Sequence, residues 1–255
     1  MDGTASGRDS VALGSLLARP TSAELTLIAV REEPLLAVSL PAEANWATSE
    51  RQARTMLAQT RDAMAPHART VVESDVLIWR ALRRAVRRDH RDLLVVGSAR
   101  DADDGRVRLG RSARELVDHL ECPLAVAPSG MADRENPRLD RIGVGFDGGP
   151  ASRAALGLAT SIASAAGAEL EVWGAVEDSL ERELAPASGN GGPTEVHVRV
   201  GMPTDVLCEL GSRVDLLVIG SGHSGRSGRV QLGGTGRALL HYAPCPMLVV
   251  PRPPD

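Results

Sequence analysis

Two stretches of this chain repeat the same series of landmarks at a constant distance. The later series comprises an apolar run, a glycine-rich segment and a Cys-Pro step into a last apolar run: Leu216–Gly220, Gly233–Gly236 and Cys245–Pro251. The earlier series reads Leu93–Gly97, Gly110 and Cys122–Pro128. Matching positions differ by 123 residues (220 − 97, 233 − 110 and 245 − 122). A constant offset over several elements indicates a duplicated unit, so the sequence predicts two related copies of one domain.

A second offset joins the beginnings of the two copies. Ala23-Glu24-Leu25 matches Ala168-Glu169-Leu170, and Asp2-Gly3 matches Asp147-Gly148, at a distance of 145 residues (170 − 25). The offsets differ by 22 residues (145 − 123), which places an insertion between Arg31 and Ala68 in the first copy. We expect domains at residues 1–130 and 139–255, joined by a polar linker that contains Pro137.

Strands alternate with helical segments in both copies. Such alternation predicts an α/β fold with doubly wound parallel sheets, connected by right-handed crossovers. Ligands of these folds bind beyond the carboxyl ends of the strands, where the strand order reverses. Asp147 and Gly220 both follow predicted strands of the second copy, so we expect them to meet at one site.

The first copy lacks one predicted strand. Arg141–Phe146 leads into Asp147, whereas only Met1 precedes the matching Asp2. Four or five buried apolar side chains at about 1.5 to 3 kcal/mol each would be comparable with the whole stability of a domain. We hypothesise that the true start lies upstream or that another strand fills the gap. The intact mass of the native protein tests the first option, because a mass matching Met1 to Asp255 rules it out.

Composition excludes several classes of function. The longest apolar runs are too short to span a membrane, and no basic segment with an apolar core follows Met1, so we expect a cytoplasmic protein. All 29 basic residues are arginine, which excludes a Walker A lysine and Schiff-base chemistry. A net charge of −4 and five aromatic residues (3 Trp, 1 Tyr, 1 Phe) argue against nucleic-acid binding. Cys122 and Cys245 fit small buried residues better than redox chemistry.

The series of motifs resembles the universal stress protein family, in its tandem form common in actinobacteria, over almost the whole chain. The resemblance rests on Asp-Gly after the first strand, Gly-Ser after the fourth and Cys-Pro before the fifth. It implies five-stranded parallel sheets with strand order 3-2-1-4-5, the first copy lacking its first strand. ATP-binding members carry Gly-x2-Gly-x9-Gly-(Ser/Thr) after the fourth strand. The second copy keeps this spacing, with His223 in place of the second glycine and Gly234 at the hydroxyl position.

The resemblance implies an ATP site, with Mg²⁺, in the second copy. Its residues would be Asp147 and Ala175 near the adenosine, and, around the phosphates, Gly220, Gly222, His223, Gly233, Gly234 and Thr235. Glycine suits a phosphate loop because backbone N–H groups can then form a concave nest without side chains in the way. A left-handed conformation at His223 would cost about 1 to 2 kcal/mol. For Asp147, a helix cap is a serious alternative.

The first-copy loop departs further from the motif. Arg100 stands at the glycine position, and Asp101, Asp103 and Asp104 follow it. These carboxylates would repel phosphate unless Mg²⁺ bridged them, so a structural role is favoured there.

Other motifs carry less weight. Gly220–Gly225 spells Gly-x-Gly-x-x-Gly but lies at the last crossover, which is the wrong place for a dinucleotide fingerprint. Gly222–Arg226 narrowly misses a nucleophile elbow because residue 226 is not glycine. The arginines between Arg80 and Arg91 form one helical face, which we interpret as solvated rather than as a nucleic-acid footprint. The six histidines show no metal-ligand spacing.

We therefore predict a non-enzymatic, nucleotide-linked stress regulator that acts on an unknown protein partner. The alternative is a regulatory or scaffold module of the same fold without nucleotide binding. Weak ATP hydrolysis would have only His223 or Asp147 as a general base. We expect the two copies to pack as an intramolecular pseudo-dimer through Leu124–Ala127 and Met247–Val250, with further homodimerisation left open.

Overall fold

The computed structural model describes residues 3–33, 42–174, 195–222 and 228–254. Its first copy contains, in chain order, α1 (Ala5–Thr21), β1 (Thr26–Glu32), α2 (Ala42–Met64), β2 (Arg69–Asp75), α3 (Ile78–Arg88), β3 (Leu94–Gly97), α4 (Arg111–Val117) and β4 (Leu124–Ala127). The linker holds a short 3-10 helix, η1 (Met131–Asp133). The second copy contains β5 (Arg141–Phe146), α5 (Pro150–Ala166), β6 (Glu169–Gly174), β7 (Glu195–Val198), α7 (Pro203–Gly211), β8 (Leu216–Gly220), α8 (Gly234–Tyr242) and β9 (Met247–Val250).

Local sequence explains where the helices that flank the site begin. The Thr4 hydroxyl caps α1 by accepting a hydrogen bond from the Gly7 N–H at 3.4 Å. In the second copy Pro150 opens α5, where its fixed φ suits the first helical turn and its missing N–H costs nothing. In the second copy, α5 therefore begins four residues after the end of β5 (150 − 146). In the first copy, α1 begins at the corresponding place, Ala5 (150 − 145).

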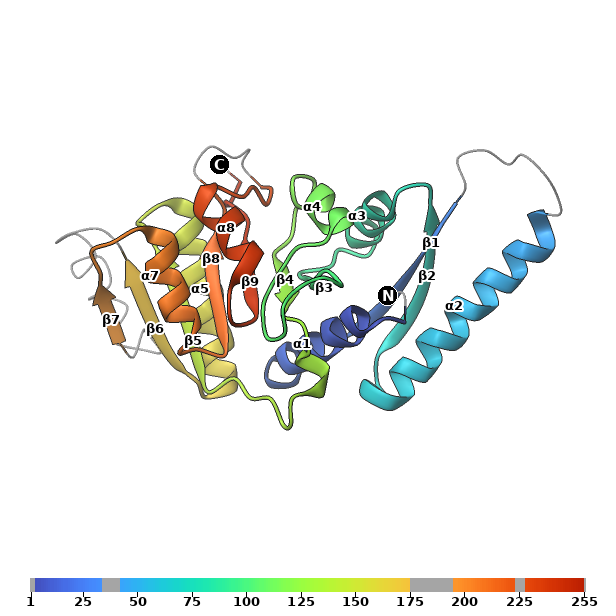
Figure 1. Cartoon of the computed structure of the whole chain (residues 1–255), viewed down its shortest axis with the longest axis horizontal. Coiled ribbons are helices and arrows are strands. Elements are labelled where there is room, and N and C mark those ends of the chain that lie inside the picture. Colours follow the sequence, from blue (N-terminus) through green and yellow to red (C-terminus); the bar gives the residue numbers. More distant parts are fainter. Residues whose placement is uncertain (1–2, 34–41, 175–194, 223–227, 255) are drawn as a thin grey trace.

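A seven-stranded sheet forms the centre of the molecule, with strand order β3-β4-β9-β8-β5-β6-β7 (Figure 1). The second copy contributes β9-β8-β5-β6-β7, which are its fifth, fourth, first, second and third strands, all paired in parallel. All four residues of β4 and of β9 are buried, as expected for strands covered by helices on both faces. The α/β class predicted from the sequence is confirmed.

The two copies join edge to edge at their last strands. β4 pairs antiparallel with β9, so that Ala125 lies opposite Leu248. This is the contact between Leu124–Ala127 and Met247–Val250 that the sequence predicts for an intramolecular pseudo-dimer.

The described part of the first copy has no first strand, as the sequence predicts, and its four other strands do not form one sheet. β1 and β2 form a separate two-stranded sheet, while β3 and β4 belong to the seven-stranded sheet. In Figure 1 the two-stranded sheet stands apart on the right, next to α2. The physical reason is the missing first strand: in the second copy β5 joins β6 to β8, and the described residues of the first copy contain no strand at the matching place.

Two apolar cores cover the two faces of the large sheet. One gathers side chains of α3, α4, α7 and α8 with both copies' strands, including Leu116, Leu124, Leu210, Leu239 and Val249. The other lies under α1 and α5, and includes Leu13, Ala125, Ala159, Val218 and Leu248. A third, smaller cluster holds β1 to α2 through Leu27 and Leu57. Within the described ranges, no helix combines the length and apolar character that crossing a bilayer requires.

Candidate nucleotide site at the carboxyl edge of the second copy

A serine after β8 holds together the two arms of the second-copy loop. The Ser221 N–H donates to the Val250 carbonyl at 2.8 Å, and the Gln231 N–H donates to Ser221 Oγ at 3.2 Å. The Gly222 N–H also donates to the Gln231 carbonyl at 2.7 Å. The arm that leaves β8 and the arm that enters α8 are therefore paired like two short strands.

The first copy repeats this arrangement at the same offset. The Ala99 N–H donates to the Arg108 carbonyl at 2.7 Å, and the Arg108 N–H donates to Ser98 Oγ at 3.1 Å. Ser98 Oγ itself donates to the Ala127 carbonyl at 2.6 Å. The scaffold of the loop is thus present twice, as the spacing predicts.

Close backbone approaches explain two of the predicted site glycines. A Cβ at Gly222 would lie 2.6 Å from the Gly233 nitrogen, and a Cβ at Gly220 would lie 2.5 Å from the carbonyl carbon of Ala151. The loop arm therefore contacts the start of α8, and the end of β8 packs on the first turn of α5. These contacts leave no room for any other residue type at either position.

The start of α8 is open on one side. Gly233 is the N-cap of α8 and provides no side chain to cap the first N–H groups. A Cβ at Gly234 would meet nothing within 4 Å, and Thr235 is half-buried in the same turn. Uncapped N–H groups at a helix start, together with the helix dipole, favour an anion.

Asp147 reaches the same edge of the sheet but is held locally. β5 and β8 run in parallel with Gly145 opposite Ile219, so Asp147 and Ser221 follow neighbouring strand ends. Asp147 is exposed, and its Oδ1 accepts a hydrogen bond from the Gly149 N–H at 2.8 Å. This turn before α5 is close to the capping role that the sequence left open. Ala175 and His223, the remaining predicted site residues, lie outside the described residues.

Side-chain contacts brace the first-copy loop. Ser6 Oγ donates to the Ser98 carbonyl at 2.5 Å. Arg108 pairs with the Asp101 carboxylate at 3.0 Å and donates to the Asp101 carbonyl at 3.1 Å. Arg100 lines a cavity of about 270 Å³ beside Asp9, whose carboxylate accepts N–H groups of the linker. These contacts agree with the structural role expected for this loop.

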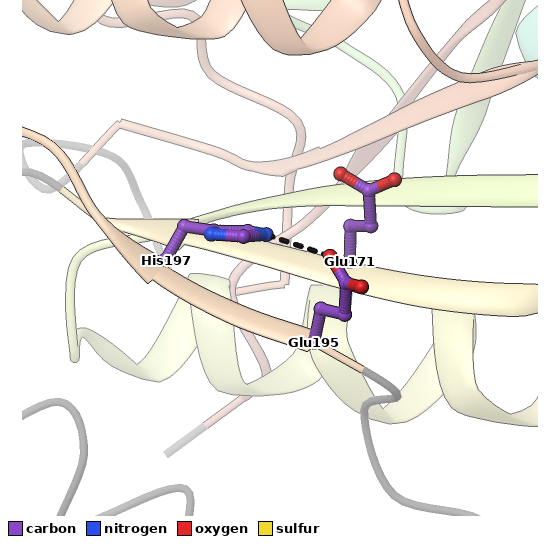
Figure 2. A group of neighbouring side chains, drawn as sticks. All are labelled: Glu171, Glu195 and His197. Carbon is purple, nitrogen blue, oxygen red and sulfur yellow. Dashed lines mark hydrogen bonds and ion pairs between the residues drawn. The ribbon is translucent and has the colours of Figure 1, made fainter.

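One group of ionisable side chains escaped the sequence reasoning. Glu171 on β6 lies opposite Glu195 on β7, and His197 follows on the same face (Figure 2). One ligand atom from each lies within 4.8 Å of the others. The period-2 spacing of Glu195 and His197 was the available signal, since alternate strand residues share a face.

The contacts of this group account for it without a metal ion. His197 Nε2 lies 2.9 Å from a Glu195 oxygen, and Trp173 Nε1 donates to Glu171 Oε2 at 3.2 Å. The guanidinium groups of Arg199 and Arg213 lie over the Trp173 ring, at 5.2 and 5.4 Å from its centroid. We interpret the group as a polar network that packs the outer end of the sheet.

Two further predictions concern buried or charged side chains. Cys122 and Cys245 are buried as expected, and burial raises the pKa of both thiols to about 12, so neither is a reactive thiolate near neutral pH.

The arginine face of α3 is more than a solvated surface, because Arg84 and Arg88 pair with Glu73 and Asp75 of β2.

Comparisons with known proteins place this fold and loop in a family. The model of the Universal stress protein family matches residues 1–128 and 171–251. Universal stress protein Rv2005c of Mycobacterium tuberculosis is 31% identical over 181 residues, which cover 62% of this chain and 61% of the relative. Universal stress protein Mb2028c of Mycobacterium bovis aligns with the same figures. The alignment thus spans about three fifths of these relatives.

Solved structures of low sequence identity share the fold. A universal stress protein from Archaeoglobus fulgidus superposes with a TM-score of 0.74 at 16% identity, covering 96% of this chain and 94% of that one. A putative universal stress protein from Pseudomonas aeruginosa gives 0.62 at 15% identity, with coverages of 94% and 86%. Duplicated motifs, sheet topology and the family match agree, and this chain belongs to the universal stress protein family.

Proposed function

We propose that this chain is a nucleotide-binding stress-response regulator whose second domain, residues 139–255, binds ATP. The observation that carries the proposal is the loop that Ser221 holds beside the start of α8. In this loop Gly222 contacts Gly233, and the first turn of α8 lacks a side-chain cap. Phosphate oxygens would be held by the N–H groups of Gly233, Gly234 and Thr235, while Gly222, whose N–H donates to the Gln231 carbonyl, and Gly220 leave the loop free of side chains. Asp147 would contact the adenosine, with Ala175 beside the base and His223 near the phosphates.

The donor set at this edge suits a nucleotide. Backbone N–H groups bind anionic oxygens without a lysine, which this chain does not contain. Mg²⁺ would accompany the phosphates and offset part of their negative charge. The first domain, residues 1–130, would serve as the packing partner, because Arg100 replaces the loop glycine and Ser6 and Arg108 brace the loop.

Calorimetric titration of the chain with ATP and Mg²⁺ tests the proposal. We expect one site per chain, and we expect Gly233→Trp to abolish the heat. Gly234→Glu should weaken binding at least tenfold, because it adds a carboxylate at the helix start where the position has room for a side chain. His223→Gly should strengthen binding about tenfold where the bound loop takes a left-handed conformation at this position, because glycine adopts that conformation without the cost of about 1 to 2 kcal/mol.

Matched variants in the first copy provide the control. Gly110→Trp and Arg111→Glu occupy the positions 123 residues earlier (233 − 123 and 234 − 123) and should leave the heat unchanged. Absence of heat and of a thermal shift at millimolar ATP would contradict nucleotide binding. That result would favour the second candidate, a scaffold module, for which the observed turn at Asp147 already gives a structural role.

Binding would act through the surface offered to a protein partner rather than through catalysis, and the protein would work in the cytoplasm. ADP release measured over hours with saturating ATP tests the non-enzymatic part. Release that disappears in Asp147→Asn while the calorimetric signal of ATP binding persists would instead assign that carboxylate as a general base.

A further inference from the structure

The outer edge of the large sheet carries exposed apolar side chains. β7 is the last strand in the sheet order, and among the described strands it pairs only with β6 (Figure 1). Of the five exposed large apolar side chains in the described residues, three lie within one stretch of five residues here: Val198, Val200 and Met202, at 39%, 97% and 69% exposure. An edge strand with such side chains favours pairing with a further strand.

The backbone of β7 determines which of its polar groups face outward. β6 and β7 run in parallel, and the Arg199 N–H donates to the Gly174 carbonyl at 3.0 Å. The backbone groups of successive residues point to opposite sides of a strand, so His197 faces β6 as Arg199 does. Val196 and Val198 therefore direct their N–H and C=O groups away from β6, toward the outer edge.

The side chains of this strand are self-complementary. Residues 195–199 read Glu-Val-His-Val-Arg, with an acid and a base at equal distances from His197. When two copies pair antiparallel about a two-fold axis at His197, Glu195 of each copy lies opposite Arg199 of the other. Opposite charges directly across two strands stabilise their pairing, and like charges destabilise it. The strand therefore matches a second copy of itself, as a two-fold interface requires.

The directions of the backbone groups fit the same axis. In an antiparallel pair, residues that exchange hydrogen bonds alternate with residues that do not, and the latter bring their side chains closer together. With the axis at His197, the outward-facing Val196 of one copy exchanges hydrogen bonds with Val198 of the other. Glu195 and Arg199 then fall in the closer pairs. An axis at Val196 or at Val198 would leave Glu195 without an arginine opposite it.

Both charges are accessible from the edge. The Glu195 side chain is 61% exposed, and Arg199 is exposed with its guanidinium 5.2 Å from the centroid of the Trp173 ring. Glu195 Oε2 lies 2.9 Å from His197 Nε2. A carboxylate can accept several hydrogen bonds, so Glu195 can keep this contact while it accepts an arginine of a second copy.

We propose that β7 is a homodimerisation edge, at which a second copy of this chain pairs antiparallel about a two-fold axis at His197. The seven-stranded sheets of two chains would become one continuous sheet, and Val198 would be covered. The pairing of β4 with β9 inside one chain is separated from this edge by β8, β5 and β6, so both pairings can form together. One strand edge is smaller than a standard interface of roughly 1,200 to 2,000 Å², so the dimer should dissociate on dilution.

Sedimentation velocity of the 255-residue chain over a concentration series tests the proposal. The mass should rise reversibly from that of one chain to that of two. Arg199→Glu places carboxylates opposite each other at both ends of the paired strands, and it should raise the dissociation constant of the dimer about tenfold or more. Glu195→Arg combined with Arg199→Glu exchanges the two signs, and it should return the constant to within about threefold of the parent value.

Two further variants separate the edge from the face of the sheet. Val198→Pro removes an N–H that points away from β6, so the chain should fold while the dimer loses a hydrogen bond on each side of the axis and weakens about tenfold or more. Arg213→Glu is the matched control for charge. The Arg213 guanidinium lies 5.4 Å from the centroid of the same Trp173 ring, but it comes from the segment after α7, so this variant should dimerise like the parent. Circular dichroism of each variant checks that it is folded.

Amide hydrogen exchange followed by NMR at low and high chain concentration checks the register. The amides of Val196 and Val198 should become protected as the dimer forms, while those of His197 and Arg199, which already face β6, should not change. A chain that keeps the mass of one copy at about 1 mM would overturn the proposal. So would a dimer that Arg199→Glu and Val198→Pro leave intact, a charge exchange that restores no affinity, or concentration-dependent protection on another strand instead of β7.

Discussion

Ser98 and Ser221 show how one small side chain can fix a loop in both copies. Each is nearly inaccessible to solvent, and each hydroxyl accepts the N–H of the residue ten positions later, Arg108 or Gln231. A serine hydroxyl can donate and accept a hydrogen bond at the same time. At this point two chain segments diverge, and the hydroxyl accepts the backbone N–H that would otherwise pair with a carbonyl of a neighbouring strand. Ser98 uses both capacities, because it also donates to the Ala127 carbonyl at 2.6 Å.

Replacing Ser98 by alanine should destabilise the protein by about 1 to 3 kcal/mol, since buried partners would be left without hydrogen bonds. The loss should appear as a lower urea midpoint with an unchanged slope. Ser212→Ala is the matched control, because Ser212 is exposed and, among the described residues, its hydroxyl bonds only to the local Glu209 carbonyl. Equal losses in the two variants would contradict this account of the loop.

At the scale of elements, charge pairs fasten α3 to β2. Arg84 Nη1 donates to Asp75 at 2.8 Å, and Arg88 Nη1 donates to Glu73 at 2.7 Å. Glu73 and Asp75 are 7% and 9% exposed, so β2 carries carboxylates in places where water reaches them poorly. The helix supplies the compensating charge, which explains why its arginines share one face.

This pairing predicts a loss of stability in acid. Burial alone would raise the pKa of the Asp75 carboxyl, but the Leu77 N–H and the Arg84 and Arg80 guanidinium groups outweigh burial and lower it below 3.8. The unfolded chain therefore binds more protons in this range, and the stabilisation present above pH 3.8 is lost as the pH falls through the lowered pKa. The difference in unfolding free energy between the parent and Asp75→Asn should shrink below about pH 4.

Urea unfolding at pH 6, 5, 4 and 3 measures that difference. In an Arg84→Gln background the dependence on pH should be weaker, because the largest side-chain contribution that lowers the Asp75 pKa is gone. A difference that stays constant down to pH 3 would show that Asp75 contributes through packing instead.

At the scale of the whole molecule, the two copies share the cores on both faces of the large sheet. The antiparallel pairing of β4 with β9 makes one sheet, and one apolar cluster contains Leu116 and Leu124 of the first copy with Leu240 and Val249 of the second. β1, β2 and α2 pack around a cluster of their own. Two large shared cores and one small separate cluster predict two levels of protection from hydrogen exchange.

Native-state hydrogen exchange should therefore show the slowest exchange in β4, β8, β9 and β5, from both copies together. Amides of Thr26–Glu32 and Arg69–Asp75 should exchange faster, through opening of the two-stranded sheet alone. Because the missing strand would join these regions, uniform slow exchange throughout the chain would contradict this division.

Much of the architecture could be predicted from the sequence. The offsets of 123 and 145 residues identify the copies, the apolar runs identify the strands, and Pro150 and Gly233 mark where helices begin. These features are local or repeated, so periodicity and turn chemistry specify them without knowledge of distant contacts. The seam between β4 and β9 was also predictable, because both final strands are apolar throughout.

The candidate site was only partly accessible to this reasoning. The glycine spacing placed Gly220, Gly222 and Gly233 correctly at one edge, but only the tertiary structure showed that Gly220 and Gly222 are also required by backbone contacts. From the sequence, Asp147 could have been a nucleotide ligand or a helix cap. The structure shows that its carboxylate accepts the Gly149 N–H, a contact that depends on the turn before α5. Glu171 and His197 come together only through strand pairing, which depends on residues far apart in the chain.

The sequence by itself determined that one unit occurs twice, and that residues 1–255 contain no run matching Arg141–Phe146 before Asp2. Only the tertiary structure decided the consequence of that missing strand. Sheets are held by hydrogen bonds between neighbouring strands, so without the central strand β1 and β3 cannot reach each other, and the first copy divides around a cavity lined by Leu27 and Val95.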